Sequence, residues 1–112
     1  MTNVELLSEA ELCIVLVGEK WSLLIVREIL AGKSKFSEIR QGLRMSSEIL
    51  SDRLQLLVRR GILIRETYRE PGSRTRDRYV LTAAGAALLP VLTAMGDWGH
   101  TYGQQPVVGE RD

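Results

Sequence analysis

Four glycines divide the first sixty-one residues into short segments with helical character, which restricts the chain to a set of small packed helices. Each glycine follows a run in which apolar residues recur at the spacing of a helix, and glycine is common where helices end. The four positions are Gly18, Gly32, Gly42 and Gly61. The helices predicted between them cover residues 4–17, 21–31, 36–41 and 46–60.

The pattern changes after Gly61. Residues 62–68 and 78–81 are rich in β-branched and aromatic residues, and turn-forming residues lie between them at 70–73. This arrangement predicts a hairpin with a long basic tip. Thr82 is expected to cap a last helix that reaches about residue 98 and is kinked at Pro90. Beyond it, residues 103–112 are expected to form a flexible tail.

The order of these elements predicts the fold. A short helix, a tight turn and a longer helix make a helix-turn-helix, and a hairpin that follows them is a wing. Ser46 can cap the longer helix, since its hydroxyl accepts from free N–H groups of the first turn. The fold class is therefore mainly α with a small β-hairpin, a winged helix-turn-helix. At 112 residues, we expect one domain over residues 1–102.

Charge is distributed unevenly along the chain. The net charge is only +1, but residues 33–78 hold twelve basic and six acidic residues, while both ends are net acidic. A basic patch is typical of a surface that binds phosphate. A solvated basic face explains the same charge pattern, and charge alone leaves both interpretations open.

Several classes of protein are disfavoured. One Cys and one His cannot form an intrachain disulfide or a four-ligand zinc site. No glycine-rich phosphate loop, nucleophile elbow or paired metal ligands are found, so we expect no enzyme, catalytic residue, metal or cofactor. The longest apolar run near the N-terminus has six residues, residues 12–17, so we expect a cytoplasmic protein without a membrane span.

The predicted helix-turn-helix nominates residues for contact with double-stranded DNA. Residues at the start of its second helix reach base edges in the major groove; they are Ser46, Ser47, Glu48 and Ser51. Phosphate contacts are expected from flanking and wing residues; these are Lys33, Lys35, Arg44, Gln55, Arg74 and Arg76. Two alternatives stay open: a salt bridge from Glu48 to Arg44 or Lys35, and a role for Arg53 as an internal strut.

Both ends of the chain carry more apolar surface than one small domain can cover. Apolar residues span nearly half the circumference of the last predicted helix, whereas packing on its own domain needs a stripe of little more than about 100°. We therefore expect a homodimer, with two recognition helices about 34 Å apart on a palindromic site. The predicted interface residues are Leu12, Leu16, Leu88, Leu92, Met95 and Trp98.

Several short motifs, in one shared order, carry a resemblance to a known family. They are Gly18-Glu19-Lys20-Trp21, Phe36-Ser37-Glu38-Ile39-Arg40, Leu50-Ser51-Asp52-Arg53-Leu54, Tyr79-Val80-Leu81-Thr82 with Gly85, and Pro90-Val91-Leu92 with Trp98-Gly99. Over roughly residues 8–99 the chain resembles the HxlR family of bacterial, MarR-like winged-helix transcription regulators. The resemblance implies a homodimeric DNA-binding regulator, expected here to be a repressor. It also implies that the first and last helices form the dimer interface and that Arg76 occupies the basic wing position.

Many members of that family resemble redox sensors with a cysteine near the N-terminus. That cysteine usually lies about thirteen residues before the tryptophan, where this chain has Ser8; Cys13 lies eight residues before Trp21. Cys13 is therefore either a redox switch or a small core residue. Two alternative functions remain: a winged-helix module that binds protein, and a redox or small-molecule sensor whose switch is another residue. A small-molecule effector would fit a pocket between apolar helices near Trp21, Trp98 and Tyr102, and the alternative is that both tryptophans are core residues.

Overall fold

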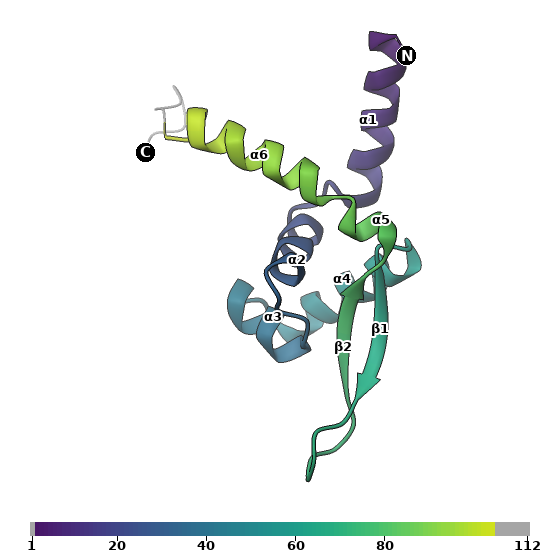
Figure 1. The fold of residues 1–112 in the computed structure, drawn as a ribbon, viewed down its shortest axis with the longest axis vertical. Coiled ribbons are helices and arrows are strands. Elements are labelled where there is room, and N and C mark those ends of the chain that lie inside the picture. Colours follow the sequence, from purple (N-terminus) through teal and green to yellow (C-terminus); the bar gives the residue numbers. More distant parts are fainter. Residues whose placement is uncertain (1, 105–112) are drawn as a thin grey trace.

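The computed structural model describes residues 2–104, so most of the predicted tail, 103–112, lies outside the described residues. Helices and strands follow the predicted order (Figure 1). They are α1 (Asn3–Val17), α2 (Lys20–Leu30), α3 (Phe36–Leu43), α4 (Ser47–Arg59), β1 (Leu63–Tyr68), β2 (Arg76–Leu81), α5 (Ala83–Ala86) and α6 (Leu89–Tyr102). The protein is mainly helical with one two-stranded antiparallel sheet, a winged helix-turn-helix in which α3 and α4 are the helix pair and the hairpin is the wing.

Local side chains start most of the helices. Thr2 caps α1, Glu19 caps α2 by accepting from the N–H of Ser22, and Ser46 caps α4 by accepting from the N–H of Ile49 at 3.2 Å. These bonds satisfy N–H groups that have no partner inside the helix. The predicted role of Ser46 as a cap is confirmed.

The end of α3 differs from the prediction. The helix continues through Gly42 to Leu43, and Arg44 is the left-handed residue that ends it, with φ 54°. Gly42 lies where α3 meets α2: a Cβ there would collide with the carboxylate of Glu28. The glycine leaves room for the Glu28 side chain of α2, a neighbour that a local pattern does not reveal.

The hairpin is one regular ladder with a projecting tip. Pairing runs from Leu63 opposite Leu81 to Tyr68 opposite Arg76. The second strand therefore begins at Arg76, two residues earlier than predicted, because Arg76 still has a partner across the ladder. The N–H of Tyr79 donates to the carbonyl of Ser34 at 2.8 Å and ties the wing to the segment before α3.

The single kinked helix predicted after Thr82 is wrong. Thr82 caps α5, as predicted, by accepting from the N–H of Gly85, but α5 ends at Ala86 and α6 begins at Leu89. Pro90 lies in the first turn of α6. Proline fits there because first-turn residues need no backbone N–H donor, so the chain breaks before the proline and starts a new helix.

The core lies between α2, α3, α4 and the start of the hairpin. Its most buried side chains are Ile25, Val26, Ile39, Leu50, Leu54, Leu57 and Leu63. In Figure 1, α1 and α6 leave this body at one end and the hairpin tip extends from the other. Within residues 2–104, no helix is long and apolar enough to cross a membrane.

Candidate nucleic-acid interface

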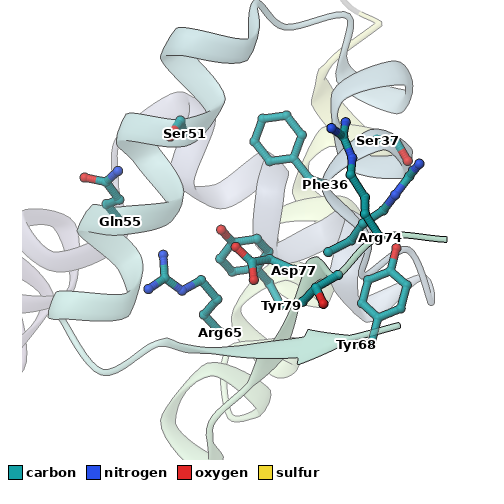
Figure 2. A pocket seen from close by; sticks show the side chains of 11 residues that line it. Phe36, Ser37, Ser51, Gln55, Arg65, Tyr68, Arg74, Asp77 and Tyr79 are labelled. Carbon is teal, nitrogen blue, oxygen red and sulfur yellow. The ribbon is translucent and has the colours of Figure 1, made fainter. Parts of the chain in front are cut away.

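A groove of about 510 Å³ separates α4 from the hairpin. Figure 2 shows side chains from both elements turned toward it, with Ser51 and Gln55 on the helix and Arg65, Arg74 and Tyr68 on the wing. Phe36, from the first turn of α3, covers part of its floor. The groove therefore combines polar and cationic groups from two elements that are distant in sequence.

The structure brings four of the nominated residues together in this groove. They are Ser51, Gln55, Arg74 and Arg76. Ser47 and Glu48 line a shallower hollow beside it, at the start of α4, together with Ser51. Ser46 is exposed next to them, but its oxygen already accepts the capping bond, which leaves its O–H free to donate.

Lys33 and Lys35 are engaged within the protein. The Lys33 ammonium lies 3.4 Å from the carboxylate of Glu28, and the Lys35 ammonium donates to the carboxylate of Glu70 at 2.7 Å. The hydrogen bond from Lys35 lowers the pKa of Glu70, and the bond to Glu70 raises the pKa of Lys35. Lys35 therefore links the start of α3 to the hairpin tip. Arg44 is exposed in the turn between α3 and α4.

Over the residues that it describes, the structure does not show the salt bridge considered for Glu48, but it does show an internal ion pair for Arg53. Among residues 2–104 no ion pair of Glu48 is present, and Lys35, one of its two possible partners, pairs with Glu70. Arg53 places its Nε 3.2 Å from the Glu19 carboxylate. It is a strut between α4 and the start of α2, in agreement with the interpretation from its place on the helix.

Arg65 is a groove residue that sequence reasoning missed. It lies opposite Tyr79 in the ladder, and Figure 2 shows its guanidinium extending toward α4 near Gln55. Burial, followed by the Asp77 carboxylate, raises the pKa of the Tyr79 hydroxyl, and the nearby Arg65 cation opposes this. The sequence could have indicated this position, because side chains alternate between the two faces of a strand. Arg65 therefore lies on the same face of β1 as the buried Leu63.

The nominated dimer residues fall into two groups. Leu12, Leu16, Met95 and Trp98 are exposed, whereas Leu88 is buried in the core of its own chain and Leu92 packs partly against that core. Leu88 thus offers a partner little surface. Twelve of the fourteen exposed large apolar side chains in the described part of the chain lie on α1 and α6, the exceptions being Ile49 and Ile64.

Cys13 belongs to no cluster of metal-ligating side chains in the described part of the chain. Cys13 is a half-buried free thiol on α1 that packs against the edge of the core. No group of three or more His, Cys, Asp or Glu side chains is placed to hold a metal ion in residues 2–104.

Comparison with known proteins finds a family model and relatives that are named as HTH-type transcriptional regulators. The family model described as HxlR-like helix-turn-helix matches residues 16–106. An uncharacterised HTH-type transcriptional regulator of Mycobacterium tuberculosis is 36% identical over 91 residues, which cover 81% of this chain and 56% of that protein. The uncharacterised HTH-type regulator YvaP of Bacillus subtilis is 33% identical over 103 residues, 91% of this chain and 94% of that one.

A solved structure has the same fold. The redox regulator HypR in its reduced form superposes with a TM-score of 0.76 at 27% identity, covering 86% of this chain and 94% of that chain. The chain spans only about half the length of the mycobacterial relative. Family model, relatives and fold agree over most of the sequence, and the chain belongs to the HxlR-like helix-turn-helix family.

Proposed function

We propose that this protein is a DNA-binding transcriptional regulator that binds a palindromic site as a homodimer and acts in the cytoplasm as a repressor. It uses α4 to reach base edges and the hairpin to hold phosphates, without catalysis. The names of its relatives, which are HTH-type transcriptional regulators, support this proposal.

The observation that carries the proposal is the groove between α4 and the hairpin. Polar side chains on α4, Ser51 and Gln55, face three arginines of the hairpin, Arg65, Arg74 and Arg76. The Ser51 hydroxyl can donate to or accept from base edges, the Gln55 amide can donate to a phosphate, and guanidinium groups suit phosphates or a narrow minor groove. Base-reading and phosphate-binding groups therefore line one surface.

The distribution of apolar surface supports the homodimer. Apolar side chains are exposed along α1 and α6, and these helices leave the body opposite the hairpin tip (Figure 1). A second copy that covers them would leave both α4 helices free to face DNA. Exposed apolar surface of this extent marks an interaction site.

The test is a fluorescence anisotropy titration with two kinds of duplex. One is the region upstream of the protein's own gene, and the other is a set of duplexes selected from a randomised library. We expect Arg76→Ala to weaken binding to every duplex by a similar factor, because a phosphate contact carries no sequence information. The slope of log affinity against log salt should flatten by about one unit.

Lys20→Ala is the matched control. It removes the same charge from the end of α2 that borders α6, away from the groove, so the salt slope should stay at its wild-type value. A wild-type protein that selects no duplex from the library would contradict the proposed function and favour a protein-binding module. An unchanged slope in Arg76→Ala would remove this residue from the interface.

A further inference from the structure

Few contacts attach α1 to the rest of the chain. The helix projects from the body (Figure 1), and of its fifteen residues only Val17 is buried. Gly18 joins it to α2 without a long connection. The direction in which α1 projects must therefore be fixed near its C-terminal end.

Val17 and the half-buried Cys13 pack against the core near that end, and Arg60, the C-cap residue of α4, adds a polar contact. Its Nη1 donates to the carbonyl of Val15 at 3.1 Å and to the carbonyl of Leu16 at 2.9 Å. The last carbonyls of a helix have no partner within it, and a cation there is favourable. No basic residue lies in the last turn of α1, so Arg60 supplies this group from another helix.

A second arginine of α4 binds the start of the next helix. Arg53 pairs with Glu19, the N-cap of α2, and Glu19 also accepts from the N–H of Ser22 at 3.0 Å. Arg53 and Arg60 are seven residues apart, which places them on one face of α4 about two turns apart. Arg53 holds α4 on the body, while Arg60 alone of the two reaches α1.

A small change in the angle of α1 at Arg60 produces a large displacement at the far end of the helix. α1 has fifteen residues and is therefore about 22 Å long. A tilt of about 10° over that length displaces the far end by about 4 Å, close to the rise of about 3.4 Å per base pair. In a two-fold dimer held through α1 and α6, such a tilt occurs in each protomer and moves each α4 helix by a distance on the order of one base-pair rise.

We propose that Arg60 is a positioning residue that fixes α1 against the recognition helix and thereby sets the half-site spacing that the dimer accepts. The inference rests on the proposed function, because it requires a DNA-binding dimer. It assigns Arg60 no contact with DNA. The predicted signature is therefore a change in spacing preference with little change in affinity for a single half-site.

The experiment measures affinity for one selected duplex remade with its half-sites one or two base pairs closer or further apart, and for a duplex with a single half-site. For the wild type we expect a loss of about tenfold or more per altered spacing, since half-site spacing is a geometric requirement. For Arg60→Met, which keeps an apolar side chain but no donor, the loss should fall to about threefold or less. Single half-site affinity should stay within about twofold of wild type.

Arg59→Met is the matched control, because it removes the same charge from the neighbouring exposed residue of α4. It should leave the dependence on spacing as sharp as in the wild type, whatever it does to overall affinity. If Arg60→Met does not fold, Arg60→Gln replaces it with the same expectation, since its shorter side chain cannot reach both carbonyls. A wild-type spacing profile in either Arg60 variant overturns the inference, as does a wild type indifferent to spacing. A wild type that binds no duplex contradicts the proposed function instead.

Discussion

At Gly85 the absence of a side chain allows α5 to lie close to the residue before β1. A Cβ at this position would overlap the backbone carbonyl oxygen of Ile62. That oxygen cannot move freely, because it accepts from the backbone N–H of Thr82 at 3.1 Å. The glycine after Tyr79-Val80-Leu81-Thr82 therefore allows α5 to approach the start of β1.

We expect Gly85→Ala to lower the free energy of unfolding by about 1–3 kcal/mol, as overpacking does elsewhere. Urea denaturation followed by circular dichroism measures it. Gly99→Ala is the control, because no atom lies within 4 Å of the added methyl and alanine favours a helix over glycine by about 1 kcal/mol. Equal denaturation midpoints for the two variants would show that the close approach of α5 to β1 does not affect the free energy of unfolding.

At the scale of single residues, the sequence predicts which residues could bind phosphate more reliably than it predicts which residues they contact. Arg74 and Arg76 could be nominated because they lie beside turn residues, and both line the groove. Lys35 is predicted to bind phosphate from its charge and its place beside the helix pair, but it bonds Glu70, which is thirty-five residues further along the chain. A partner so distant in sequence depends on where the hairpin lies, and composition does not contain that information.

At the scale of elements, the local sequence predicts where a helix begins better than where it ends. Ser46 and Thr82 act as caps where expected because a cap needs only a side chain and the N–H groups two or three residues later. Gly42 does not end α3; it lies within the helix beside the Glu28 side chain of α2, and Arg44 takes the left-handed position at the end. Pro90 marks a helix start because α5 ends before it, and the pattern alone did not distinguish a break from a kink.

The Glu19 cap of α2 predicts a dependence of stability on pH. Burial alone would raise the pKa of this carboxyl, but hydrogen bonds from the N–H groups of Ser22 and Trp21 and the Arg53 cation lower it below its ordinary value of 4.5. The unfolded chain therefore takes up this proton at a higher pH than the folded chain. The stabilisation is complete above that ordinary value and is lost as pH falls through the folded pKa.

We expect Glu19→Gln to be less stable than wild type at pH 7 and to approach wild-type stability as pH falls below about 4. Urea denaturation from pH 7 to pH 3 measures the difference. Glu5→Gln is the control, because Glu5 lies in the first turn of α1 and its side chain makes no hydrogen bond or ion pair in the described part of the chain. A difference between Glu19→Gln and wild type that stays constant with pH would contradict this account of the cap.

At the scale of the whole molecule, opposite ends have opposite surfaces. The hairpin and α4 present arginines and polar groups, while α1 and α6 present apolar side chains. The uneven charge of the sequence predicts this division. It did not predict that Leu88 would be buried in its own chain, because the break between α5 and α6 turns that residue into the core.

We expect Met95→Glu to shift the protein from dimer to monomer at micromolar concentration, because it buries a charge in the proposed interface. Analytical ultracentrifugation measures the fractions of dimer and monomer. Ile64→Glu is a matched control: Met95 and Ile64 are both 50% exposed, but Ile64 lies on the hairpin. Dissociation by Ile64→Glu with none by Met95→Glu would place the interface on the hairpin side, and a monomeric wild type would exclude the dimer.

The bond between Lys35 and Glu70 has a consequence for any phosphate that approaches the hairpin tip. The Glu70 carboxylate takes one of the three N–H donors of the ammonium, at 2.7 Å, and offsets its charge. A phosphate at the hairpin tip can reach the remaining donors, but it also meets the negative charge of Glu70. Lys35 therefore adds less to phosphate binding than an unpaired lysine at the same place would.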